Sequence, residues 1–290
     1  MSLKQRAEQL GHLFFYVMLH LGGQRLAYFT LHPIIFSYIL FSPTPHRNLS
    51  TYIFRRFPGA SWLSRRVHVY KIVIGMGKTL IDRALLGLKK NHTFQGTFTG
   101  FSDLQTILKK GGAVVVLAHV GTWQTAMSHM AGLDTPVHAI MVHDDTAVSK
   151  HFYEMGRERS FTPIDANGFM GGMIEAANIL EQGELVLIMG DRAEGGKTTA
   201  VPFLGEDINL PVAAYNLAAI TDSPIVIAFS AKTGTNSHEL KVWDIFWPHF
   251  SETAKKPELN RCATRFSRAL EQYVEAYPHQ WYNFFDIWHQ

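Results

Sequence analysis

The sequence predicts an α/β fold in which a mixed, mostly parallel central sheet is flanked by helices and preceded by a helical amino-terminal segment. Short runs of β-branched and apolar residues, with the length of buried strands, recur after residue 93. Stretches with helical periodicity separate these runs, as in sheets whose parallel strands are joined by helices. Earlier in the chain the patterns are helical, and the most apolar stretch lies at 10–42. We therefore expect a helical segment at 1–88 and an α/β domain at 89–290.

The composition is that of a folded protein with a substantial core. The chain has 290 residues, an apolar fraction of 47% and a charged fraction of 18%, which exclude general disorder. Its single cysteine, Cys262, excludes an intramolecular disulfide and fits a reducing compartment. We expect this cysteine to be an inert, packed thiol.

The net charge of +3 is distributed unevenly along the chain. Before Asp82 the only acidic residue is Glu8, whereas basic residues are frequent there. They are Lys4, Arg6, Arg25, Arg47, Arg55, Arg56, Arg65, Arg66, Lys71 and Lys78. This asymmetry predicts an anionic partner, and the apolar residues between the charges favour an anionic membrane surface over nucleic acid. A solvated basic surface is the alternative.

Residues 10–42 are the most apolar part of the chain, but they do not form a clean membrane span. Glycines, histidines, an arginine and Pro33 interrupt the roughly 20 apolar residues that a spanning helix needs. We expect two helices that lie in or on a membrane interface. A buried helical hairpin and a spanning anchor are the alternatives. The short polar stretch 1–9 does not resemble a cleaved signal peptide.

The next stretch, 46–88, is typical of two helices broken at Pro58-Gly59, the second capped by Ser61. Within it, Gly75-Met-Gly-Lys-Thr79 resembles the end of a phosphate-binding loop. The first glycine of that motif is replaced by Ile72, and the stretch does not follow a strand. We therefore do not expect nucleotide binding here.

The α/β part is predicted element by element. Strands are expected at 94–101, 113–118, 137–142, 162–165, 184–189, 224–229 and 238–246. Helices are expected at 102–110, with Ser102 as its cap, and at 122–131, 149–159, 168–182 and 257–277. The aromatic stretch 281–288 is interpreted as core packing.

The buried run 113–118 ends at His119, and Gly121 opens the next helix. Open α/β sheets bind ligands at this position, and histidine is the side chain best suited to act as a general base near neutral pH. A hydrogen-bonded histidine in a structural turn is the alternative. Two other strand ends should share this edge of the sheet. They carry His143-Asp144-Asp145 and Asp191-Arg192.

Several blocks resemble the late acyltransferases of lipid A biosynthesis, the lauroyl/myristoyl transferase family within the H-x4-D/E glycerolipid acyltransferases. His119-Val-Gly-Thr-Trp-Gln124 is similar to the family's H-x-G-N-W-E block. The other similar blocks follow in the family's order. They are Asp191-Arg192, Val201-Pro-Phe-Leu-Gly205, a helix at 210–218, and Tyr277-Pro-His-Gln-Trp-Tyr282, which is similar to a closing P-e-Q-W-x-W signature.

The resemblance implies a glycerolipid-acyltransferase-like fold at the cytoplasmic face of the bacterial inner membrane. It implies acyl transfer from an acyl carrier protein or coenzyme A thioester to a hydroxyl or amine of a lipid A precursor or another bacterial amphiphile. His119 would act as general base, and Gln124 and Asp191 would complete the catalytic group. Backbone N–H groups near Gly121, or Arg192, would stabilise the oxyanion. Substrate-binding candidates are Gly121, Thr122, Trp123, Arg157, Arg159 and Arg192.

One residue departs from the family pattern. Gln124 stands where the family has an acidic residue, and it cannot supply a negative charge to an imidazolium. Asp144, Asp145 or Asp191 could supply that charge from elsewhere in the fold. The alternative is a catalytically silent relative that binds acyl chains or acyl carrier protein as a partner subunit.

Two further expectations concern other chemistry. The histidines do not show a recognisable zinc spacing, and acyl transfer needs no metal, so we expect neither metal nor cofactor. Hydrolysis by the same histidine with water is a third function, but no G-x-S-x-G motif supports a serine route. For Arg157 and Arg159, a solvated helix face is an equal alternative to substrate binding.

Overall fold

The computed structural model of the protein describes residues 3–88, 93–123, 133–141, 161–193, 196–251 and 254–288. Several expectations lie outside these described residues. They are the helix at 149–159, nearly all of the helix at 122–131, and the candidate site residues Gln124, Asp144, Asp145, Arg157 and Arg159.

The described residues form a central sheet of seven strands. The strands are β1 (Gln95–Thr99), β2 (Ala113–Leu117), β3 (Val137–Met141), β4 (Thr162–Asp165), β5 (Leu185–Met189), β8 (Ile225–Lys232) and β9 (Ser237–Phe246). Their order is β1-β9-β8-β2-β5-β3-β4. Strands β8, β2, β5, β3 and β4 are parallel to one another, whereas β9 and β1 run the opposite way. The predicted mixed, mostly parallel sheet is confirmed, and the carboxyl ends of β2, β5 and β8 share one edge.

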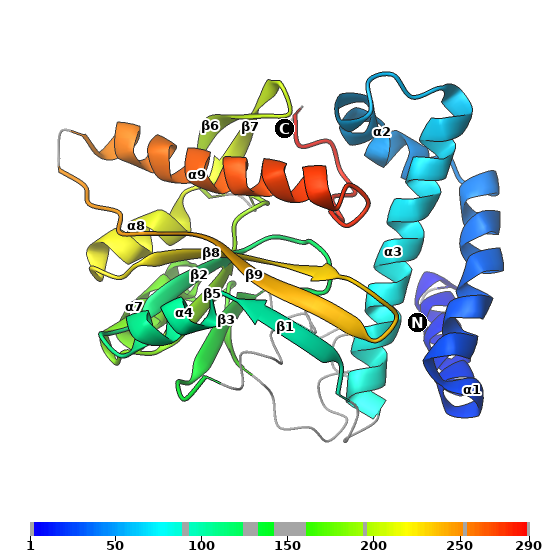
Figure 1. The fold of residues 1–290 in the computed structure, drawn as a ribbon, viewed down its shortest axis with the longest axis horizontal. Coiled ribbons are helices and arrows are strands. Elements are labelled where there is room, and N and C mark those ends of the chain that lie inside the picture. The colour runs from blue at the N-terminus through cyan, green and yellow to red at the C-terminus, as the bar shows by residue number, and fades with distance from the viewer. Residues whose placement is uncertain are drawn as a thin grey trace.

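Helices cover both faces of this sheet (Figure 1). They are α4 (Phe101–Leu108), α7 (Met173–Glu181), α8 (Ala213–Ile220) and α9 (Lys255–Ala276), and a 3-10 turn, η2 (Phe169–Gly172), precedes α7. Successive residues of a strand point to opposite faces. Val114 and Val116 therefore pack in the core under α7, α8 and α9, whereas Val115 packs in the core with Leu104 of α4. Burial on both faces explains why β2 is uninterruptedly apolar.

A short antiparallel hairpin stands apart from the sheet. It consists of β6 (Thr198–Phe203) and β7 (Glu206–Pro211), and it packs against α9. The Ser267 hydroxyl of α9 donates a hydrogen bond to the carbonyl of Pro202 at 2.6 Å. The sequence analysis did not predict this hairpin, and it treated Val201–Gly205 only as a family block.

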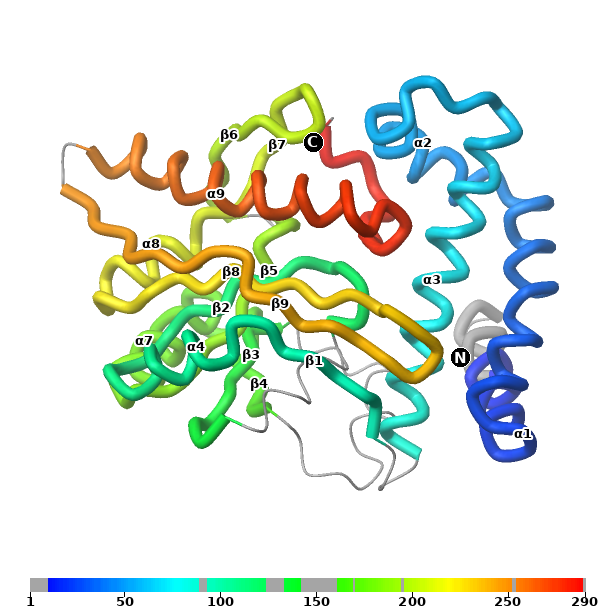
Figure 2. The backbone as a smooth tube through the Cα atoms, in the orientation of Figure 1, coloured from blue at the N-terminus to red at the C-terminus, as the bar shows by residue number. Residues whose placement is uncertain are grey.

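Three helices form a layer beside the sheet, as Figure 2 also shows. They are α1 (Leu3–Phe41), α2 (Thr44–Arg56) and α3 (Trp62–Leu88). Helix α1 is broken at Gly23, where φ is 65°, in agreement with the two helices expected. No single helix among the described residues is long and apolar enough to span a bilayer, although Leu10–Phe41 and Thr44–Arg56 would qualify together as a pair bent by 88°.

Helix α3 contains the stretch that resembles a phosphate-binding loop. Its glycines allow close packing instead: a Cβ at Gly77 would lie 2.8 Å from Leu31 of α1. A Cβ at Gly75 would lie 3.1 Å from the Tyr282 hydroxyl. The N–H of Ser64 donates to the Ser61 hydroxyl at 3.3 Å, which confirms the predicted cap.

The predicted cap of α4 is wrong. This helix begins at Phe101 after Gly100, which adopts a left-handed conformation with a φ of 86°. Ser102 therefore lies inside the helix, and its carbonyl accepts a hydrogen bond from the hydroxyl of Thr106 at 2.8 Å. The glycine precedes the helix because its positive φ turns the chain from β1 into α4.

A buried carboxylate connects the amino-terminal helices to the sheet. Asp82 of α3 is fully buried, and it accepts hydrogen bonds from Tyr28 and, at 2.7 Å, from Gln24 of α1. Its other oxygen lies 2.6 Å from the ammonium of Lys232, at the carboxyl end of β8. The three elements are thus joined across the division expected at residue 88, which itself stays a prediction.

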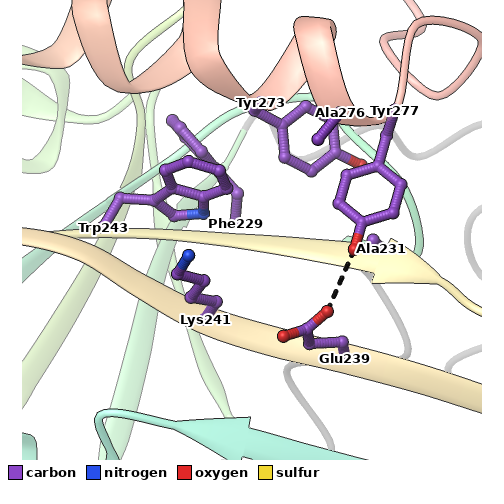
Figure 3. A pocket seen from close by; sticks show the side chains of 8 residues that line it. All are labelled: Phe229, Ala231, Glu239, Lys241, Trp243, Tyr273, Ala276 and Tyr277. Carbon is purple, nitrogen blue, oxygen red and sulfur yellow. Dashed lines mark hydrogen bonds between the residues drawn. The ribbon is translucent and has the colours of Figure 1, made fainter.

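A small cavity of about 110 Å³ lies between β8, β9 and α9 (Figure 3). Its polar groups engage one another. Tyr277 donates to Glu239 at 3.1 Å, and the Lys241 ammonium lies 4.3 Å from the centre of the Trp243 ring. His119 and Asp191 do not line it. Cys262, also on α9, is buried, and burial raises the pKa of its thiol to about 11, as expected of an unreactive packed cysteine.

Candidate active site

His119 lies just beyond the carboxyl end of β2, in the position that the sequence predicts. Its backbone is held on both sides. The carbonyl of His119 accepts the N–H of Tyr282 at 2.8 Å, and its own N–H donates to Oδ2 of Asp191 at 3.0 Å. The side chain is 20% exposed. The imidazole is therefore anchored through its backbone while part of the ring stays accessible.

Asp191 orients the ring of His119. Its Oδ1 lies 2.9 Å from Nδ1 of His119, and its Oδ2 also accepts the indole N–H of Trp281 at 3.2 Å. Asp191 follows β5, the neighbour of β2 in the sheet, so the strand order brings the two side chains together. Asp191 contacts His119, whereas the other two carboxylates considered in the sequence, Asp144 and Asp145, lie outside the described residues.

The charge of Asp191 fixes the tautomer of the histidine. Complete burial alone would raise the pKa of this carboxyl, but the attraction of His119, its hydrogen bonds and the charge of Arg192 together hold the pKa below its usual value. An ionised carboxylate only accepts hydrogen bonds, so Nδ1 of His119 carries the proton. In the neutral ring this tautomer leaves the lone pair on Nε2, which is the form that a general base requires.

The turn after His119 is tightly packed. Gly121 has a φ of 50°, and a Cβ there would overlap the backbone carbonyl of Ser230 on β8. Its N–H donates to the carbonyl of Gln280 at 2.7 Å. The N–H of Gly121 itself is therefore engaged within the protein, whereas the role of the N–H groups near it toward an oxyanion stays a prediction.

The stretch 277–283, here called the C-terminal strap, lies along the turn that follows His119, here called the His119 turn. Trp281 forms an antiparallel bridge with Val120. The side chain of Gln280 accepts from the N–H of Lys232 at 2.8 Å and donates to its carbonyl at 3.0 Å. Thr79 of α3 donates to the carbonyl of Gly121 at 3.1 Å. The turn is thus held between α3, β8 and the C-terminal strap.

The other predicted substrate-binding residues that the structure describes lie close by, and each already has a structural contact. Thr122 is completely buried. Trp123 is buried, and its ring meets the His119 ring edge-on, with centroids 5.5 Å apart. Arg192 donates to the carbonyl of Tyr282 at 3.0 Å, and its guanidinium lies over the ring of Phe285. Arg192 therefore holds the C-terminal strap, whereas its role toward substrate stays a prediction.

Trp281 is the residue at this site whose role the sequence did not reveal. The sequence analysis assigned it to core packing, and it is indeed completely buried. Its indole N–H nevertheless donates a hydrogen bond to the carboxylate of Asp191. In the parts of the chain that the structure describes, no group of three or more histidine, cysteine or carboxylate side chains is arranged to hold a metal ion.

The fold and site define a class of protein: an α/β protein with a mostly parallel sheet and, at the carboxyl edge of that sheet, a histidine oriented by a buried carboxylate. The family follows from comparison with known proteins. Residues 57–290 match the family of bacterial lipid A biosynthesis acyltransferases. The match covers most of the chain, so the protein belongs to this acyltransferase family, and the resemblance of its sequence blocks is confirmed.

The other comparisons add little. No curated protein matches the sequence. Among solved structures, the crystal structure of the 1-acyl-sn-glycerophosphate (LPA) acyltransferase PlsC from Thermotoga maritima is similar, with 13% sequence identity and a TM-score of 0.38. That similarity covers 85% of this chain and 98% of the other.

Proposed function

We propose that the protein transfers a fatty acyl group from a thioester of acyl carrier protein or coenzyme A to a hydroxyl or amine of a lipid A precursor or another bacterial amphiphile. His119 acts as the general base. The observation that carries this proposal is the hydrogen bond between Nδ1 of His119 and Oδ1 of Asp191, at 2.9 Å. It leaves Nε2 as the basic atom of a partly exposed ring in a member of an acyltransferase family.

The transfer proceeds by addition and elimination. Nε2 of His119 takes the proton of the acceptor group as its oxygen or nitrogen attacks the thioester carbonyl carbon. The tetrahedral intermediate then collapses, the carbon–sulfur bond breaks, and the imidazolium returns the proton to the leaving thiolate. Asp191 stabilises the imidazolium between these two steps, which is the task that Gln124 cannot perform. The reaction needs no reactant other than the thioester and the acceptor.

The acceptor is amphiphilic, so we also propose that the protein works on the cytoplasmic face of the inner membrane. From Leu10 to Phe41, helix α1 carries apolar side chains on more than one side. One side packs on α3 through Leu31, while Leu21, Phe29 and Phe41 on the other side are each more than 70% exposed. A helix with apolar side chains on more than one side is normally covered on each of them, and an anionic bilayer surface fits the basic residues nearby.

The corner between α2 and α3 also combines exposed apolar side chains with basic ones. Trp62 and Leu63 are 69% and 65% exposed, and arginines stack on the aromatic rings. Arg66 lies 4.5 Å from the ring centre of Trp62, and Arg65 lies 5.0 Å from that of Phe54. Tryptophan and arginine side chains are well suited to the headgroup level of a membrane.

The test of the catalytic proposal is transfer of a labelled acyl chain from acyl carrier protein or coenzyme A to a total bacterial lipid extract. We expect the wild type to label one lipid class and His119→Ala to lose the labelling while remaining folded. His249→Ala is the matched control, because the His249 side chain is 73% exposed. Its labelling should equal that of the wild type.

Three other results would contradict the proposal, and the first two identify alternatives. Thioester binding without any turnover would indicate the silent relative suggested by Gln124. Release of free fatty acid without need of an acceptor would indicate hydrolysis. Labelling that survives His119→Ala would remove the histidine from the mechanism.

A further inference from the structure

A pair of histidines joins α3 to the C-terminal strap. Nδ1 of His68 lies 2.8 Å from Nε2 of His279, and the two rings are nearly parallel. Phe57, which follows α2, stacks on His68 with ring centres 3.8 Å apart, so the pair packs against the end of α2. The hydroxyl of Ser64 lies 3.3 Å from the other nitrogen of His68. Two helices and the strap thus meet at this one contact.

This contact requires a neutral ring. A hydrogen bond between two ring nitrogens needs one donor and one acceptor, and a protonated imidazole has only donors. Protonating the acceptor ring therefore replaces the hydrogen bond with two N–H groups that point at each other. The charged groups acting on the pair are Arg56 of α2 and Lys71 of α3, which are both positive and add to the repulsion.

The C-terminal strap connects this histidine pair to the His119 turn. His279 directly precedes Gln280, whose carbonyl accepts the N–H of Gly121. Trp281 binds Asp191, and the N–H of Tyr282 binds the carbonyl of His119. A movement of His279 away from α3 would therefore act on the same short stretch that holds both catalytic side chains.

We propose that His279 is a positioning residue: its hydrogen bond to His68 fastens the C-terminal strap to α3, and acid releases it, so that the His119–Asp191 pair is held in place only while the histidine pair is neutral. The direction of titration agrees. Burial and the positive charges of His68, Lys71 and Arg56 lower the pKa of His279 from 6.5 to about 4. A histidine with a lowered pKa favours the folded contact above pH 6.5, and that contribution is lost as the pH falls toward 4.

The first test does not depend on activity. We expect amide hydrogen exchange at Gly121 and Tyr282, corrected for the intrinsic pH dependence, to speed up a few-fold to about tenfold between pH 6 and pH 5 in the wild type. His279→Gln keeps a hydrogen-bonding side chain that does not titrate, so its exchange should stay constant. His249→Gln, at an exposed position, should behave as the wild type. Equal acceleration in wild type and His279→Gln, or none in either, would overturn the proposal.

A second variant should reverse the pH dependence of the contact between residue 279 and His68. His279→Glu places a carboxylate beside His68, Arg56 and Lys71, so acid should strengthen this contact down to about pH 5. We expect the Tm of wild type to fall by roughly 2–4 °C more than that of His279→Glu between pH 7 and pH 5. The same Tm loss in both proteins would contradict the proposal. His68→Asn gives an independent test, at the other ring, should a His279 variant fail to fold.

The activity readout rests on the proposed acyl transfer, whereas amide exchange and Tm do not. If transfer is observed, kcat should fall more steeply below pH 6.5 in the wild type than in His279→Gln. If no transfer is observed but the exchange results hold, the acyl-transfer proposal fails and the positioning role of His279 stands.

Discussion

Asp191 binds both the backbone N–H and the ring nitrogen of His119, although 72 residues separate the two in the chain. Under the proposed mechanism, this carboxylate takes the role that an acidic residue would have at the position of Gln124. It supplies a buried negative charge next to the imidazole, and it fixes which ring nitrogen carries the proton.

Asp191→Asn should therefore reduce acyl transfer strongly. The amide can still accept the backbone N–H of His119, but it no longer supplies charge and no longer enforces the tautomer. We expect kcat to fall by about 10²- to 10⁴-fold with little change in KM. Steady-state kinetics with an acyl thioester donor checks this. Activity within threefold of wild type would show that another group orients His119.

Gln124→Glu should change transfer little, because Asp191 already supplies the negative charge. We expect kcat within about threefold of wild type, far below the gain that would follow if a missing carboxylate limited the rate. The informative comparison is the double variant Gln124→Glu with Asp191→Asn. If glutamate restores transfer in that background, the two positions can exchange roles.

Gly121→Ala should destabilise the protein and distort the site. The positive φ disfavours a side chain, and the new methyl group would overlap the Ser230 carbonyl. We expect a loss of about 2–4 kcal/mol in the free energy of unfolding. Gly183→Ala is the matched control: its φ is 82°, but nothing lies within 4 Å of the added Cβ. Equal losses in urea unfolding would show that backbone strain alone matters.

Lys232→Met should destabilise the protein because it leaves Asp82 buried with its charge uncompensated. Breaking a buried ion pair from one side typically costs about 3–5 kcal/mol. Adding Asp82→Asn to this variant removes the charge and should recover part of the loss. Denaturant unfolding of the single and double variants measures both terms, and a double variant less stable than Lys232→Met would contradict this account.

The membrane proposal predicts binding to anionic vesicles that depends on the corner between α2 and α3. We expect Arg65→Gln to weaken binding to phosphatidylglycerol vesicles about fivefold at physiological salt, and Trp62→Ala to weaken it as well. Lys256→Gln, in the first turn of α9, should have no effect. The start of α9 and helices α2 and α3 lie on opposite sides of the molecule (Figure 1). Equal losses in Arg65→Gln and Lys256→Gln in a flotation assay would indicate only a general charge effect.

Local pattern predicted the strands well, because β2, β5 and β8 are buried on both faces and so have uninterrupted apolar runs. The partner of His119 could not be predicted in the same way. Three carboxylates followed strands, and only the sheet order, which pairs β2 with β5, brings Asp191 beside the histidine. Sequence pattern carries little information on strand order when strands are joined by long connections.

The same limit explains the other differences. The engaged N–H of Gly121 depends on the C-terminal strap, which follows it by more than 150 residues. Trp281 was interpreted by its size and apolar character, and these gave no sign of the hydrogen bond from its indole. The cap expected at Ser102 is wrong because Gly100, two residues earlier, adopts a positive φ that turns the chain, so α4 already begins at Phe101.

The matching family segment begins at residue 57, but the buried carboxylate of Asp82 draws two of its hydrogen-bond partners, Gln24 and Tyr28, from before that point. A shortened chain that starts at the family boundary would lose both partners and uncover the apolar side of α3. Loss of acyl transfer in this shortened chain would then not distinguish misfolding from lost membrane attachment. To test whether α1 attaches the protein to the bilayer, only its outward-facing side chains, such as Phe29 and Phe41, should be changed in the intact chain.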